Sequence, residues 1–115
     1  MKKEMFSTEI SILRDTFRRL LRRHAKTNII KLIDKTHPAD MALIFRYFND
    51  SEQDTVFAMM RPSEKTVEFL NELDEAITIR IVENETPSRI AEILKEASSN
   101  EQAYLMGLVE ETYAA

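Results

Sequence analysis

The segment THPADMALIFRYF at residues 36–48 decides the fold class of this 115-residue chain. Pro38 fits the first turn of an α-helix, where its missing N–H costs nothing, and Asp40 lies near the positive end of the helix dipole. We expect His37 to act as a turn or capping residue and not as a metal ligand. Apolar side chains then recur at helical spacing and predict a buried stripe, formed by Met41, Ile44, Phe45 and Phe48.

The same pattern recurs along the chain at an interval of about 25 residues. Pro38, Pro62 and Pro87 are 24 and 25 residues apart, and each precedes an apolar signature: ALIF at 42–45, VEFL at 67–70 and AEIL at 91–94. A second apolar segment follows each signature, formed by Val56, Phe57 and Met60, by Ile77, Ile81 and Val82, and by Leu105, Met106 and Val109. The spacing therefore predicts units of two short helices that bury their apolar faces against neighbouring units, as in a helical solenoid.

The composition supports a single all-α domain. Only one Gly and three Pro are present, too few turn-forming residues for a strand-rich sandwich or barrel. The absence of Cys excludes disulfides and thiolate metal sites. No apolar run approaches the roughly 20 residues that cross a bilayer, and no signal peptide is evident. We therefore expect a cytoplasmic domain.

The N-terminal segment, residues 1–25, is expected to form a basic helix that packs on the repeats. Its apolar residues lie on one helical face: Ile10, Leu13, Phe17, Leu20 and Leu21. The other face carries Arg14, Arg18, Arg19, Arg22 and Arg23. Thr27 or Asn28 is expected to cap a short second helix.

The charge is divided unevenly along the chain. Residues 1–35 hold ten basic and four acidic residues, a net +6, whereas residues 36–115 hold six basic and sixteen acidic ones, a net −10. The arginine face has three interpretations. It is a solvated face that forms ion pairs with the acidic repeats or with a second copy of the domain, or it contacts anionic lipid, or it binds nucleic acid. The acidic remainder of the chain disfavours nucleic acid.

The sequence offers no catalytic apparatus. It contains no G-x-S-x-G elbow, no catalytic Cys, no glycine-rich phosphate loop and no H-E-x-x-H motif. Paired acidic residues are common on acidic surfaces and do not by themselves indicate general acid–base catalysis. We expect a binding domain and not an enzyme.

The residues His37-Pro38-Ala39-Asp40-Met41-Ala42 resemble the "HPAD-I-A" segment that opens the repeats in the cytoplasmic N-terminal domain of MgtE-type magnesium transporters. Residues 61–70 and 86–94 are similar to the "LPP…AEVL" and "LPP…AEIL" units that follow it. The resemblance implies a right-handed superhelix of short helices over residues 26–115, behind the helix of residues 1–25.

The resemblance also implies a regulatory function. In that family the domain is joined to a CBS-domain pair and a membrane channel, and interface carboxylates bind Mg²⁺ in the closed state. By family position Asn100 and Glu101 are the candidate ligands, whereas Tyr104 stands where the family places an aspartate. We therefore expect Mg²⁺ to be held weakly, at an interface with a domain outside these residues.

Two rival functions are open at this point. One is a metal-independent protein-interaction scaffold like the helical repeats of flagellar motor switch proteins, which carry "HPQ-x-I-A" where this chain has residues 37–42. The other is a peripheral membrane or nucleic-acid binder that acts through the arginine face. Homodimerisation through that face is a further expectation.

Overall fold

The structure, a computed structural model, describes residues 7–114, with side chains for residues 8–110. Within these residues the chain forms eight α-helices and no strand, which confirms the predicted all-α class. The helices are α1 (Ser7–Arg22), α2 (Lys26–Lys35), α3 (Pro38–Phe45), α4 (Asp50–Ala58), α5 (Glu64–Glu72), α6 (Glu75–Glu83), α7 (Pro87–Leu94) and α8 (Ser99–Ala114).

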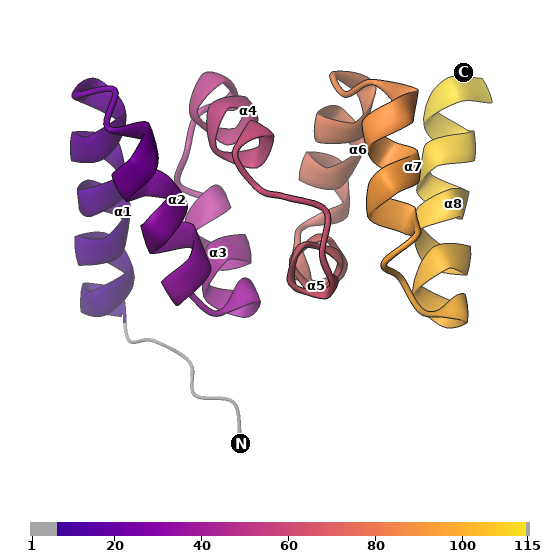
Figure 1. Cartoon of the computed structure of the whole chain (residues 1–115), viewed down its shortest axis with the longest axis horizontal. Helices are drawn as coiled ribbons and strands as arrows, with labels where there is room; N and C mark the ends of the chain where they lie inside the picture. Colours follow the sequence, from indigo (N-terminus) through magenta and orange to yellow (C-terminus); the bar gives the residue numbers. More distant parts are fainter. Residues whose placement is uncertain (1–6, 115) are drawn as a thin grey trace.

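The helices stack in chain order, with α1 at one end of the molecule and α8 at the other (Figure 1). The odd-numbered helices form one layer, in which α1 packs on α3, α3 on α5 and α5 on α7. In the second layer α4 packs on α6 and α6 on α8. The stack measures 37 × 33 × 22 Å along its principal axes. Each unit of two helices therefore buries its apolar face against its neighbours, as expected for helical repeats.

The starts of the repeat helices explain the spacing of the prolines. In α3 the His37 Nδ1 accepts a hydrogen bond from the Ala39 N–H at 3.0 Å, and in α7 the Thr86 Oγ1 accepts one from the Arg89 N–H at 3.2 Å. Both helices have proline in the first turn. His37 is thus a capping residue, as predicted. Pro62 differs, because Ser63 caps α5 and the proline precedes the helix.

A row of phenylalanines joins the layers. Phe17 of α1 contacts Phe48 with ring centroids 6.0 Å apart, and Phe48 contacts Phe45 at 5.5 Å. Phe45 of α3 meets Phe69 of α5 at 4.7 Å, and Phe69 meets Phe57 of α4 at 6.3 Å. All five rings are buried. Because aromatic pairs add about 0.5–1.5 kcal/mol beyond their buried area, this row fixes α1 against the repeats.

The first and last repeats show the same polar design at an interval of 49 residues. Gln53 Nε2 donates to the carbonyls of Phe45 at 2.7 Å and Phe48 at 3.4 Å. Gln102 Nε2 donates to the equivalent carbonyls, those of Leu94 at 3.0 Å and Ala97 at 3.3 Å. These glutamines satisfy carbonyls at the C-terminal ends of α3 and α7, which lack partners within their helices.

Two local expectations are wrong. The second helix begins at Lys26 with Ala25 as its N-cap, and neither Thr27 nor Asn28 caps it. The turn closes earlier because His24 adopts a positive φ of 55° and the Ala25 N–H bonds the Leu20 carbonyl. Met106, expected in the buried stripe, is 40% exposed, whereas Leu108 is buried. A stripe that contains Leu105 continues three residues later at Leu108 and not at the next residue.

Candidate functional site

Two of the five N-terminal arginines, Arg14 and Arg18, form contacts within the domain. The Arg18 guanidinium binds both carboxylate oxygens of Glu52, with Nε–Oε2 3.0 Å and Nη2–Oε1 3.3 Å, and also donates to the Tyr47 carbonyl at 2.5 Å. Arg14 pairs with Asp15 at 3.0 Å, and its guanidinium carbon lies 5.8 Å from the centre of the Tyr47 ring. The contacts to Tyr47 and Glu52 fix α1 to the α3–α4 loop and to the first turn of α4.

The other three arginines form a surface. Arg19, Arg22 and Arg23 are exposed, and their side chains contact no partner among the residues that the structure describes. Ile12 is also 61% exposed on this helix. We use the term basic face of α1 for Arg19 and Arg22 of the helix together with Arg23 in the turn that directly follows it.

The candidate metal residues lie at the start of α8. Asn100 is exposed. Glu101 forms a capping box with Ser98, since the Ser98 N–H donates to Glu101 Oε1 at 2.8 Å and the Glu101 N–H donates to Ser98 Oγ at 3.3 Å. Asn71 Nδ2 of α5 donates to Glu101 Oε2 at 3.2 Å. Both carboxylate oxygens of Glu101 therefore already have donors.

Glu101 also lines an open cleft between α5 and the α7–α8 loop. The cleft has a volume of about 550 Å³, and its acidic lining residues are Glu64, Glu68, Glu96 and Glu101, beside Ala97 and Ser98. Glu64 and Glu68 lie one turn apart on α5, and Glu68 Oε2 is 4.0 Å from His37 Nε2. We call this hollow the acidic cleft. It places four carboxylates on one surface.

The sequence analysis identified only one of these four glutamates. Glu64 and Glu68 lie about thirty residues from Glu96 and Glu101, and only the packing of α5 against α7 and α8 brings them together. The capping role of Glu101, in contrast, had a local signal. Ser98 three residues before Glu101 is an S-x-x-E pattern, which is typical of a capping box.

The carboxylates of the acidic cleft do not form a complete metal site by themselves. Within the described part of the chain, no group of three or more His, Cys, Asp or Glu side chains could hold a metal ion. Mg²⁺ usually keeps several waters and binds through one or two carboxylates. The described residues therefore do not form a complete coordination shell for Mg²⁺.

Tyr104 does not line the acidic cleft and carries no negative charge at neutral pH. Burial raises the pKa of Tyr104 above its ordinary value of 10.0, and the nearby carboxylate of Glu75 raises it further. Its hydroxyl is therefore protonated at neutral pH.

The equivalent site in the first repeat contains a bound arginine, which the acidic cleft lacks. Asn49 and Glu52 form a capping box with bonds of 2.8 Å, and they occupy the positions of Ser98 and Glu101 at the 49-residue interval. Glu52 is bound by Arg18. Glu101 is bound by the neutral Asn71 amide instead, and no arginine contacts it among residues 8–110.

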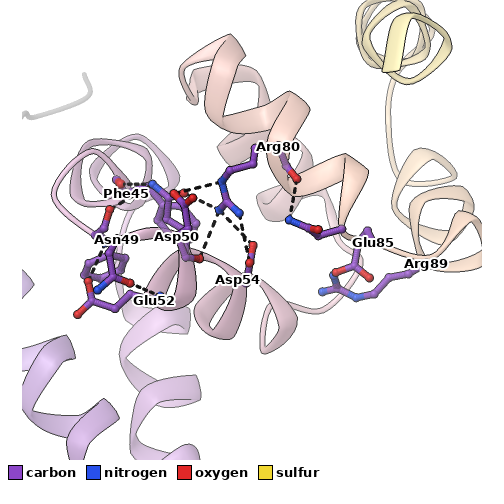
Figure 2. A network of polar contacts seen from close by, with 11 residues as sticks. Phe45, Asn49, Asp50, Glu52, Asp54, Arg80, Glu85 and Arg89 are labelled. Atoms are coloured by element: carbon purple, nitrogen blue, oxygen red, sulfur yellow. Dashed lines mark hydrogen bonds and ion pairs between the residues drawn. The ribbon is translucent and has the colours of Figure 1, made fainter. Parts of the chain in front are cut away.

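Two further arginines are used to hold the repeats together. Figure 2 shows Arg80 of α6 reaching α4, where its guanidinium contacts Gln53 Oε1 at 2.6 Å, Asp54 Oδ1 at 3.1 Å and Asp50 Oδ1 at 3.5 Å. Arg89 pairs with Glu85 at 2.6 Å. It also donates to the Phe57 carbonyl at 2.8 Å and to the Met60 carbonyl, and lies 4.6 Å from the centre of the Phe57 ring. Both arginines stabilise the α4–α6–α7 junction and are not available to a ligand.

Comparison with known proteins places the chain in a family. The profile of the family described as MgtE intracellular N domain matches residues 36–114, which is more than half of the chain and covers α3 through α8. No curated protein and no solved structure matches the chain with significant similarity. None of the helices in the described residues is long and apolar enough to span a membrane. On the extent of the profile match, this chain belongs to the MgtE intracellular N domain family.

Proposed function

We propose that this domain is the cytoplasmic, Mg²⁺-responsive regulatory domain of an MgtE-type magnesium transporter, and that it acts through the acidic cleft. The observation that carries the proposal is the convergence of four glutamates from α5, the α7–α8 loop and α8 on one open surface of a member of this family. The function is binding and not catalysis.

Electrostatic repulsion among the carboxylates of the cleft accounts for the proposed response to Mg²⁺. Carboxylates that share one cleft repel each other and repel any acidic surface brought against them, within a Debye length of about 8 Å at physiological salt. A hydrated Mg²⁺ between the two surfaces removes this repulsion and adds attraction. Mg²⁺ binding thereby favours the docked arrangement of the domain and its partner, and loss of Mg²⁺ favours separation. The expected partner is the CBS-domain pair of the transporter.

The isolated domain provides a first test. For a dissociation constant near 1 mM, about 10 mM MgCl₂ should raise the free energy of unfolding by about 1.4 kcal/mol above that in NaCl of equal ionic strength. The variant Glu64→Gln/Glu68→Gln should lose most of this increment. The matched control Glu83→Gln/Glu110→Gln, which removes the same charge from exposed positions on α6 and α8, should keep it. Equal stabilisation by both salts in all three proteins would contradict the proposal.

A second function has its own supporting observation. Both carboxylate oxygens of Glu101 already accept hydrogen bonds, which favours a metal-independent scaffold in which the cleft receives a basic side chain of a partner protein. This alternative predicts no difference between MgCl₂ and NaCl at equal ionic strength.

A further inference from the structure

The basic face of α1 has the chemistry of a docking surface. Arg19 and Arg22 lie on the terminal helix of the stack and Arg23 directly follows it. All three are exposed, and their side chains form no hydrogen bond or ion pair with the described residues. The exposed Ile12 adds apolar area on the same helix. An exposed row of arginines recognises carboxylates well, because each guanidinium can donate two parallel hydrogen bonds to one carboxylate.

One contact within the chain shows which groups an α1 arginine binds. Arg18 binds the carboxylate of Glu52, the capping-box glutamate of the first repeat, and donates to the carbonyl of Tyr47, two residues before the N-cap of α4. At the 49-residue interval the last repeat presents the same capping box through Glu101, and Glu96 takes the position of Tyr47. In the last repeat the Asn71 amide of α5 takes the place of Arg18 on this glutamate. Three more carboxylates line the open cleft beside Glu101, those of Glu64, Glu68 and Glu96.

We propose that the domain associates head to tail with a second copy of itself, the basic face of α1 in one copy docking into the acidic cleft of the next. Arg22 lies one helical turn beyond Arg18 and is exposed, so it can contact a second copy while Arg18 remains bound to Glu52. The proposal goes beyond the regulatory function, because the contact requires no metal ion.

Charge distribution favours a second copy over other occupants. Residues 1–35 carry a net +6 and residues 36–115 a net −10, so head-to-tail docking brings opposite charges together. An anionic membrane or nucleic acid on the basic face would be repelled by the acidic remainder of the same molecule. In Figure 1, α1 and α8 occupy opposite ends of the stack, so one copy can present both surfaces at once. Such a heterologous contact leaves one free surface at each end and adds further copies as concentration rises.

Sedimentation velocity of the full chain in EDTA tests the proposal separately from any response to Mg²⁺. The wild-type domain should self-associate with increasing concentration, and the association constant should fall about tenfold or more between about 0.05 and 0.5 M NaCl. Arg19→Gln/Arg22→Gln/Arg23→Gln, which leaves Arg14 and Arg18 in place, and Glu64→Gln/Glu68→Gln should each be monomeric. The control Lys31→Gln/Lys35→Gln/Arg61→Gln removes three exposed positive charges elsewhere and should associate like the wild type.

A mixture of the two monomeric variants gives the sharpest result. One variant retains the acidic cleft and the other retains the basic face, so the mixture should form a 1:1 complex and stop there. A wild-type domain that stays monomeric up to about 0.5 mM at low salt overturns the proposal. So does a mixture that forms no complex while both variants keep the wild-type circular dichroism. Binding of the basic face to phosphatidylglycerol vesicles by a monomeric wild type would assign that face to lipid and also overturn it.

Discussion

Replacing Gln53 by Leu should destabilise this domain far more than the same change at Gln102. The two glutamines occupy equivalent positions in the first and last repeats and donate to equivalent pairs of carbonyls. They differ in burial, because Gln53 is only 5% exposed and Gln102 is exposed. The two substitutions therefore test the same hydrogen-bond pattern in a buried and in an exposed position of one chain.

The magnitude follows from the partners that each glutamine leaves behind. Without Gln53, the carbonyl of the fully buried Phe45 keeps only the 3.3 Å bond from the Phe48 N–H, and Arg80 loses its 2.6 Å acceptor. A buried polar group without its partner costs about 1–3 kcal/mol, so the sum is about 3 kcal/mol. At Gln102 water can replace the lost donor, and the cost should be below about 1 kcal/mol.

Urea denaturation followed by circular dichroism measures both values, with the slope of the transition as a check that the unfolded states are comparable. We expect the midpoint of thermal unfolding to fall by about 12 °C for Gln53→Leu, at about 4 °C per kcal/mol for a domain of this size. Equal losses at the two positions would refute the role assigned to burial. A loss below about 1 kcal/mol at Gln53 would show that its bonds to Phe45 and Arg80 contribute little.

Three further predictions follow from single side chains. Arg89→Met should cost about 3 kcal/mol in urea denaturation, since it removes the half-buried ion-pair partner of Glu85 and a charged donor to the Phe57 and Met60 carbonyls. Arg46→Met, which breaks an exposed ion pair with Asp74, should cost less than about 1 kcal/mol. Ser63→Ala should cost about 1 kcal/mol through loss of the α5 N-cap, with unfolding midpoints as the readout. Ultraviolet titration should find the Tyr104 phenol ionising above pH 10, as the difference between the wild type and Tyr104→Phe. Because the folded-state pKa is raised, the stability linked to the protonated phenol is complete below about pH 10 and is lost as the pH rises further. A Tyr104 that ionises at or below its ordinary value would contradict the partial burial of this side chain and its closeness to Glu75.

The helices themselves were predictable from sequence, because each carries its own apolar spacing. Met41, Ile44 and Phe45 are buried on α3, and the proline and His37 before them mark the start of that helix. The exceptions are local. The start of α2 depends on the left-handed conformation of His24, for which a histidine is only a weak sequence signal.

The candidate site was less predictable, because its residues come together only through packing. Glu101 was identified by its family position, but its capping box with Ser98 and its bond from Asn71 emerge from the structure. Glu64 and Glu68 look in sequence like ordinary solvated residues of an amphipathic helix. Their role in the acidic cleft depends on α5 packing beside α7 and α8, a long-range arrangement that helical periodicity does not specify.

The regulatory function is tested most directly by a Mg²⁺ titration of the isolated domain, followed through amide chemical shifts by NMR with CaCl₂ and NaCl as controls. We predict saturable shifts that cluster at Glu64, Glu68, Glu96 and Glu101, with no comparable shifts at Glu83 and Glu110. NaCl of equal ionic strength should not reproduce them. Shifts spread evenly over all exposed carboxylates, or shifts of the same size in NaCl, would contradict a Mg²⁺-responsive acidic cleft.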